Sequence, residues 1–269
     1  MKRSIFCGLL AAMLLSTPAQ AAQIEQTERA ERSVIVQVDG HWLDSRGVVR
    51  DGVTYVPLRA LLDALGDWTL TWDAGAAAAV AVSGERTLIA DPAADTVTLD
   101  GISHSAGVSV EQGRTMVPLR LVGELLGATV EWDPYLSGAA VTSADAPYNA
   151  VDYYWLSRII SAESQGEPLE GQIAVGNVVV NRVESDQFPD SIAGVVFDQK
   201  YAVQFEPVEN GTVYSDPYHL SLEAAGRVLD GETTVDGALY FYAPDLSPGT
   251  WINANRTYLT TIGCHRFYL

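Results

Sequence analysis

The chain has 269 residues, and its 34 acidic against 16 basic side chains give a formal net charge of −18. This acidity argues against nucleic acid as a partner. The length suits two domains of ordinary size, and an apolar content of 48% is enough to supply a core for each.

Residues 1–21 have the pattern of a secretory signal peptide. Lys2 and Arg3 precede an apolar run over 5–15, and the small-residue tripeptide Ala19-Gln20-Ala21 follows it. The run is shorter than the ~20 residues that span a bilayer, which disfavours an uncleaved anchor. We expect cleavage after Ala21 and a mature protein outside the cytoplasm, without a transmembrane segment.

The N-terminal half contains an internal repeat. Val56-Pro57-Leu58-Arg59 recurs as Val117-Pro118-Leu119-Arg120, and both copies continue into a glycine and then Trp-Asp, at 72–73 and 132–133. In each copy a turn, at 51–52 or 112–113, precedes a short strand, and the proline marks the start of a helix. Strands are also predicted over 80–83 and 96–99. The repeated unit is therefore predicted to be α+β.

These motifs resemble the copper amine oxidase N-terminal-like domain, a stalk module of exported bacterial proteins, over residues 33–143. No copper is expected, because His41 and His104 are the only imidazoles in this half. The domain is either a spacer or a surface that contacts the wall or another protein. Arg59 and Arg120 occupy equivalent places in the two copies, which favours ion pairs within the fold over ligand contacts. Residues 143–147 have the composition of a short linker.

A helix that carries a misplaced carboxylate opens the C-terminal half. Asp152 can cap a helix that runs to Glu163. Leu156, Ile159 and Glu163 share one helical stripe, so a carboxylate stands where an apolar core residue is expected. Either the side chain escapes to solvent at the last turn, or it lies half-buried at the base of a cleft. Burial would raise its pKa and make it a general acid.

The rest of this half is predicted to be mainly helical with a small β element. We expect a buried helix over 171–183 and a second helix over 220–229, preceded by Ser215-Asp216-Pro217. The runs 237–242 and 263–269 are predicted strands. Cys264 is the one cysteine beyond the predicted signal peptide, and we interpret it as a small buried side chain rather than a reactive thiol.

Several motifs resemble the SleB-type cell wall hydrolases, the spore cortex-lytic enzyme family. The matching stretches are Arg158-Ile159-Ile160-Ser161-Ala162-Glu163, Gly166-Glu167-Pro168, Glu170 to Val175, Val179 to Val183, Phe188-Pro189, Ile192 to Val196, Gln204-Phe205, Ala238 to Pro244, Trp251, and Ile262-Gly263 with His265 and Phe267. They occur in order through residues 147–269. The resemblance implies a lysozyme-like fold and a lytic transglycosylase that acts on peptidoglycan glycan strands, with Glu163 as its acid and base.

In the mechanism that the resemblance implies, the acid protonates the oxygen between muramic acid and glucosamine, and the muramoyl 6-hydroxyl then closes an anhydro ring. Ordinary glycosidases use two carboxylates. Glu206 is the candidate partner: if it faces Glu163, hydrolysis is an alternative, and exposure at the surface is the interpretation that we favour.

The candidate residues for substrate binding are Gln204, Phe205, Tyr240, Tyr242, Trp251 and Asn181. Aromatic rings offer flat apolar faces to sugars, and alternation along a strand places Tyr240 and Tyr242 on the same side. Core packing is an equal alternative for these rings. Asn181, Arg182 and Gln204 either position a sugar or satisfy backbone groups. No metal or other cofactor is expected.

Two further functions are open. A zinc amidase that cuts the peptide stem needs about three protein ligands, and this half has only His219 and His265. A wall-binding protein without activity would use the cleft for recognition alone. We expect a secreted protein of the cell wall or spore envelope, and the sequence does not separate spore cortex from vegetative peptidoglycan.

Overall fold

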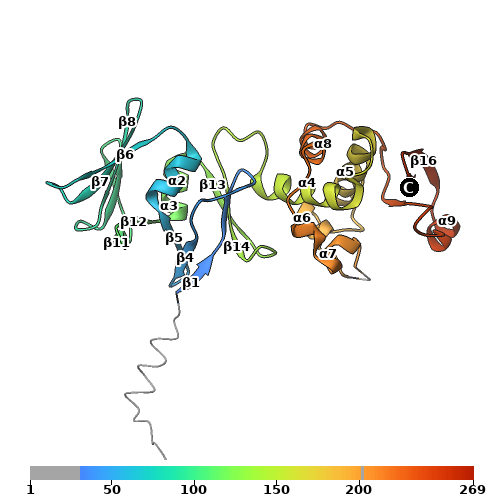
Figure 1. Cartoon of the computed structure of the whole chain (residues 1–269), viewed down its shortest axis with the longest axis horizontal. Helices are drawn as coiled ribbons and strands as arrows, with labels where there is room; N and C mark the ends of the chain where they lie inside the picture. The colour runs from blue at the N-terminus through green and yellow to red at the C-terminus, as the bar shows by residue number, and fades with distance from the viewer. Residues whose placement is uncertain (1–30, 201–202) are drawn as a thin grey trace, which may run out of the picture.

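The computed structural model describes residues 31–200 and 203–269. The predicted signal peptide, with its cleavage after Ala21, lies outside the described residues. The chain forms an elongated molecule with a β-rich N-terminal part at one end and a helical C-terminal part with a small sheet at the other (Figure 1). None of the helices in the described part is long and apolar enough to cross a membrane.

Three sheets build the N-terminal part. The first has the order β1-β4-β5-β12-β11, formed by β1 (Arg32–Val34), β4 (Gly47–Arg50), β5 (Val53–Pro57), β12 (Arg114–Pro118) and β11 (Ser109–Glu111). The second has the order β10-β9-β8-β7-β6, formed by β10 (Ile102–Ser105), β9 (Thr96–Leu99), β8 (Arg86–Asp91), β7 (Ala78–Ser83) and β6 (Thr69–Asp73). The third has the order β13-β14-β2-β3, formed by β13 (Thr129–Asp133), β14 (Gly138–Thr142), β2 (Val36–Val38) and β3 (His41–Trp42). The strands predicted at 80–83 and 96–99 are confirmed.

The two segments that repeat in sequence have the same order of elements, namely strand, helix, strand, strand. They are β5-α2-β6-β7 and β12-α3-β13-β14, where α2 is Leu58–Leu65 and α3 is Leu119–Leu125. Each first strand follows a two-residue hairpin turn in which both residues have positive φ, at 51–52 and at 112–113. This geometry matches the twist of the paired strands. Each helix begins directly after its proline, as the sequence predicts.

One hydrophobic core serves both segments. β5 pairs with β12, with Val56 opposite Val117, and both valines are fully buried. Leu58 and Leu119 are also fully buried and belong to the same core. Burial of a leucine side chain contributes about 1.5–3 kcal/mol. Neither segment therefore has a core of its own, and the N-terminal part folds as one body.

The repeated arginines bond to the backbone of the strand that follows their helix. Arg59 Nη2 donates to Leu70 O at 3.3 Å, and Arg120 Nη1 donates to Val130 O at 2.5 Å. Arg120 also lies 3.4 Å from Glu124, but Arg59 forms no ion pair within residues 31–200 and 203–269. The predicted ion pairs are therefore wrong for Arg59, because the strand edge beside it offers a carbonyl oxygen.

The C-terminal part is a helical core with a small antiparallel sheet. Its helices are α4 (Ala150–Ser164), α5 (Leu169–Val183), α6 (Ile192–Val196), α7 (Glu206–Asn210), the 3-10 turn η1 (Thr212–Tyr214), α8 (His219–Leu229) and α9 (Thr250–Asn255), and its sheet has the order β15-β17-β16, with β15 (Tyr240–Tyr242), β17 (His265–Tyr268) and β16 (Tyr258–Ile262). The helix predicted to run to Glu163, those predicted over 171–183 and 220–229, and the strands predicted within 237–242 and 263–269 are confirmed, while β16 was not predicted. The helix cap at Asp152 is wrong: Asn149 Oδ1 accepts from the backbone N–H groups of Val151 and Asp152. The helix therefore begins before the predicted cap.

The predicted linker at 143–147 does not separate two independent bodies. The start of α4 packs against the third sheet, where Gln37 Nε2 donates to Ala150 O at 3.2 Å and Ala150 N donates to Thr142 Oγ1 at 2.9 Å. The ring of Trp42 packs edge-on against Tyr154, with 5.5 Å between centroids. These contacts hold α4 directly against the N-terminal part.

A buried hydrogen bond at the same junction joins the two parts. Trp155 Nε1 donates to Asp133 Oδ2 at 2.7 Å, and both residues are almost fully buried. Asp133 Oδ1 also accepts from the backbone N–H groups of Tyr135 and Leu136. Both oxygens of the carboxylate are therefore occupied, which offsets the cost of burying its charge.

We expect Asp133→Asn to lower the free energy of unfolding by about 1–3 kcal/mol. An asparagine has one side-chain oxygen, so either the turn or the Trp155 indole loses its acceptor. Asp73→Asn is the matched control, because Asp73 bonds only to the N–H groups of its turn, through one oxygen, and is exposed. Urea denaturation followed by tryptophan fluorescence measures both variants. Equal effects of the two substitutions would show that the hydrogen bond between Trp155 and Asp133 does not stabilise the fold.

Candidate active site

Glu163 lies on the last turn of α4, at the end of the stripe that builds the core. Leu156, Ile159 and Ile160 on this stripe are fully buried. Glu163 is half-buried, because the helix ends at Ser164 and the chain turns before α5 begins. The helix therefore runs through a dry core and places a carboxylate on the wall of a cleft at its end.

The cleft has a volume of about 240 Å³ and is formed by segments that are distant in sequence. Glu163 comes from α4, Arg182 from α5, Glu206 from the start of α7, and His265 from β17. The complete set of lining residues is Glu163, Arg182, Gln204, Phe205, Glu206, Phe241, Tyr242, Ala243, Leu246, Ser247 and His265. Tertiary packing alone brings these side chains together.

The environment of Glu163 favours its protonated form. Burial raises the pKa of this carboxyl to about 7; the negative charge of Glu206 adds to the rise, and the positive charge of Arg182 opposes it. A carboxyl group with a pKa near 7 exchanges a proton readily at neutral pH. Of the two interpretations of Glu163 from the sequence, the structure therefore places it at a cleft rather than free in solvent.

Arg182 faces this carboxyl with an uncommitted donor. Its guanidinium is buried, its Nε donates to Leu239 O at 2.8 Å, and its Nη1 has no hydrogen-bond partner among the described residues. The rings of Phe188 and Phe205 lie 4.9 and 5.1 Å from it. Burial lowers its pKa to about 10, so it stays charged at neutral pH. Nη1 is therefore a buried donor without a partner among the described residues, on a side chain that lines the cleft.

His265 lines the cleft as a neutral, buried ring. Burial lowers its pKa, and its Nδ1 has no hydrogen-bond partner among the described residues, although Glu167 Oε1 lies 3.7 Å away. Glu167 also accepts from Cys264 N at 2.9 Å. Gly263 has a φ of +56°, which favours glycine, and a Cβ at this position would displace the Glu167 carboxylate. Glu167 therefore fixes the hairpin that presents His265.

Glu206 is the second carboxylate of the cleft. It is the first residue of α7, and its side chain is exposed at the rim. The sequence left two interpretations of Glu206, a carboxylate that faces Glu163 or one exposed at the surface. The structure has features of both, because Glu206 is solvent-exposed and also lies on the cleft that holds Glu163. Its negative charge raises the pKa of Glu163.

The structure brings some of the predicted binding residues to the cleft and places others beside it. Gln204, Phe205 and Tyr242 line the cleft. Tyr240 and Trp251 pack on each other at 6.2 Å outside the lining set, and Trp251 is exposed. The Asn181 side chain donates to the backbone carbonyls of Val235 and Ala238.

Arg182, rather than its neighbour Asn181, points to the cleft, and the sequence contains a signal for this. Arg182 follows the buried Val178 and Val179 at helical spacing, so a charge stands on an apolar stripe, as it does at Glu163. Cys264 is exposed, so the prediction of a small buried side chain is wrong. It lies in the turn between β16 and β17, where no core surrounds it. Within the described residues no group of three or more His, Cys, Asp or Glu is placed to hold a metal ion.

Two family models match separate parts of the chain. Residues 166–268 match the cell wall hydrolase family, and residues 37–145 match the copper amine oxidase N-terminal domain. The first match covers most of the helical C-terminal part, and the second covers most of the β-rich part.

Curated relatives resemble the C-terminal part. The spore cortex-lytic enzyme of Bacillus subtilis is 35% identical over 116 residues, which are 43% of this chain and 37% of the relative. The spore cortex-lytic enzyme of Halalkalibacterium halodurans is 33% identical over 126 residues, which are 47% of this chain and 37% of the relative. The chain therefore spans little more than a third of the length of these two relatives.

A solved structure matches the same part. The catalytic domain of the germination-specific lytic transglycosylase SleB from Bacillus anthracis shares 32% sequence identity. The match covers 46% of this chain and 98% of that chain, with a TM-score of 0.42.

We expect Glu206→Gln to lower the pKa of Glu163 below about 7, because the substitution removes a negative charge that disfavours ionisation. Glu209→Gln is the matched control, since Glu209 lies on the same short helix but not on the cleft. Carbon-13 NMR titration of the glutamate carboxyl groups measures the change. An unchanged or raised pKa of Glu163 in the Glu206→Gln variant would show that Glu206 does not act on it.

We also expect Glu163→Gln to stabilise the protein at alkaline pH. The folded pKa of Glu163 is raised to about 7, so its carboxyl binds a proton more tightly in the folded than in the unfolded chain. Stability is therefore lost as pH rises from the ordinary glutamate value of about 4.3 through about 7. The variant should gain on the order of 1–3 kcal/mol at pH 8 and little at pH 5. Urea denaturation at both pH values measures this difference, and a variant less stable at pH 8 would contradict it.

Proposed function

The chain carries a cell wall hydrolase domain at its C-terminus, and we propose that this domain cleaves the glycan strands of peptidoglycan as a lytic transglycosylase. The observation that carries the proposal is the pKa of Glu163, raised to about 7 in a cleft. Cleavage of a glycosidic bond needs a carboxyl group that is still protonated near neutral pH, because the leaving oxygen must receive a proton. The similarity of this part to spore cortex-lytic enzymes supports the same chemistry.

In the proposed reaction Glu163 acts first as an acid and then as a base. Its proton moves to the glycosidic oxygen between N-acetylmuramic acid and N-acetylglucosamine, and the bond from that oxygen to muramoyl C1 breaks. The muramoyl 6-hydroxyl oxygen then bonds to C1, and its proton returns to Glu163. The products are a free 4-hydroxyl group and a 1,6-anhydro ring, so no water is consumed.

The neighbours of Glu163 have separate parts in this proposal. Glu206 keeps the acid protonated through its charge and does not activate water. The free Nη1 of Arg182 donates to a polar group of the bound sugar, such as an acetamido oxygen. Arg182 is held for this by its bond to Leu239 O and by the aromatic rings around it.

The sugar-binding surface of the proposal extends from the cleft along β15. Gln204 and Tyr242 contact the glycan strand, and Phe205 forms the apolar base of the cleft. Trp251 offers an exposed ring face beyond the cleft. Tyr240 supports Trp251 through Arg256. The Arg256 guanidinium lies 4.4 Å from the Tyr240 ring and 5.0 Å from the Trp251 ring. Asn181 acts indirectly, by fixing the backbone that leads into β15.

The proposal includes the setting of the enzyme. We propose that residues 1–21 direct export, so that the protein acts in the cell wall or the spore envelope. A lysozyme-like fold of the C-terminal part and a duplicated, stalk-like N-terminal part belong to the same proposal. The basic, apolar and small-residue pattern of residues 1–21 and the repeated motifs support it.

The test is to incubate the full chain with spore cortex and with vegetative peptidoglycan and to identify the released muropeptides by mass spectrometry. We expect anhydromuramic ends, lighter by one water than the hydrolysis product. Glu163→Gln should lower their release by about 100-fold or more, the contribution of a general acid. Glu170→Gln is the control, because Glu170 is exposed on α5 away from the cleft.

Each other outcome would overturn the proposal in a defined way. Reducing ends that require Glu206 would indicate hydrolysis, and free peptide stems would indicate an amidase. No product from either polymer would indicate a binding protein. The polymer that is cut identifies the setting.

A further inference from the structure

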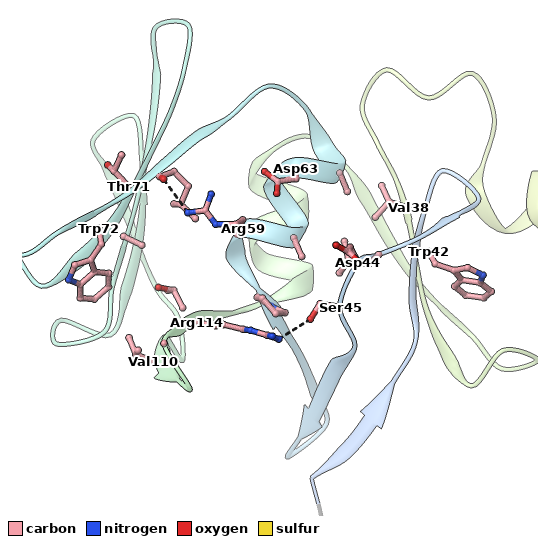
Figure 2. A pocket seen from close by; sticks show the side chains of 18 of the residues that line it. Val38, Trp42, Asp44, Ser45, Arg59, Asp63, Thr71, Trp72, Val110 and Arg114 are labelled. Atoms are coloured by element: carbon pink, nitrogen blue, oxygen red, sulfur yellow. Dashed lines mark hydrogen bonds between the residues drawn. The ribbon is translucent and has the colours of Figure 1, made fainter.

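The N-terminal part contains a groove of about 870 Å³, larger than the cleft at Glu163. Its walls are the edge strand β6, helix α2, the segment from β3 to β4, and the turn between β11 and β12 (Figure 2). The groove residues are Val38, Asp39, His41, Trp42, Leu43, Asp44, Ser45, Pro57, Arg59, Ala60, Asp63, Ala64, Leu70, Thr71, Trp72, Ala79, Val110, Gly113, Arg114 and Thr115. Its volume lies within the ~300–1,000 Å³ of typical ligand sites.

The groove has charged side chains of both signs, three aspartates and two arginines, and most of them are weakly engaged. Arg114 reaches across it to Ser45 Oγ at 3.5 Å, and Arg59 reaches Leu70 O at 3.3 Å (Figure 2). Neither arginine forms an ion pair within residues 31–200 and 203–269, and Asp44 and Asp63 have no hydrogen-bond or ion-pair partner there. Donors and acceptors are therefore both available, which suits hydroxyl and acetamido groups better than a single charge.

Trp72 gives the groove a flat apolar face. It pairs with Ala79 in the sheet, so both side chains lie on the face that borders the groove. Trp72 is 50% exposed, and no ring or cation is stacked on it among the described residues. Its counterpart Trp132 is 44% exposed but does not line the groove, and the Arg32 guanidinium lies 5.3 Å from the centre of its ring. Of the two equivalent tryptophans, Trp72 is therefore the one whose ring is available to a ligand in the groove.

We propose that this groove binds a glycan strand of peptidoglycan, with a sugar ring stacked on Trp72 and its polar groups bonded by Arg59, Asp63 and Arg114. The ring of a sugar presents C–H groups that pack on an indole face. The strongly acidic chain and the excess of acidic over basic side chains in the groove disfavour an anionic polymer. The proposal rests on the proposed function only for the identity of the polymer.

A second site for the same polymer would retain the enzyme on its substrate. The groove extends to Trp42, whose ring packs on Tyr154 of α4, the helix that carries Glu163. The two sites are therefore held in one body, and binding at one raises the local concentration of polymer at the other.

The test measures binding of the full chain to purified sacculi from which anionic polymers have been removed. The Glu163→Gln substitution is present throughout, so that the polymer is not cut. We expect Trp72→Ala to weaken the apparent Kd about tenfold, the size of losing one stacking contact. Trp132→Ala is the matched control and should leave the Kd unchanged. Trp72→Tyr keeps a planar ring and should retain most of the binding.

Unaltered binding by Trp72→Ala would overturn the proposal, and so would equal losses in Trp72→Ala and Trp72→Tyr, which would indicate a change in folding instead of stacking. Release of muropeptides by the chain with its native glutamate is measured separately. Product release with Trp72-independent binding would reject the groove alone. Trp72-dependent binding without products would reject the proposed function alone.

Discussion

The hydrogen bond between Trp155 and Asp133 lies at the point where the two parts of the chain meet. It is formed in a dry interface, where a polar group without a partner is costly, and the indole and the carboxylate satisfy each other. Around it, Gln37 and Thr142 bond to the first residue of α4. Because α4 also carries Glu163 at its far end, the N-terminal part supports the helix on which the cleft is built.

The cleft itself depends on desolvation. Glu163 is removed from water by the core that α4 helps to form, and this raises its pKa to about 7. Arg182 is buried opposite, so the site holds a cation and a group that is close to neutral. The negative charge of Glu206 at the rim raises the pKa of Glu163, and the positive charge of Arg182 lowers it. The three charges together set the protonation that the proposed chemistry needs.

The two segments that share the repeated motif differ in what their equivalent side chains contact. Asp73 and Asp133 both accept from the N–H groups of the turn that follows them. Only Asp133 has its second oxygen bonded to the C-terminal part. The Arg32 guanidinium lies 5.3 Å from the ring of Trp132, whereas Trp72 lines the groove. The second segment thus docks the C-terminal part, and the first presents a free surface.

The sequence determined what depends on local pattern. The repeat, its turns at positive φ, the leucine stripes and the helices around Glu163 follow from residue spacing and from the conformations open to glycine and proline. The apolar stripe that ends in Glu163 showed that this carboxyl group is out of place, but left open whether it reaches solvent or lies at a cleft. The tertiary structure alone decided which distant segments meet: it placed Arg182, Glu206 and His265 on one cleft and turned the predicted linker into a packed junction. Solvent exposure and charge environment depend on all neighbours in space, and periodicity along the chain does not contain that information.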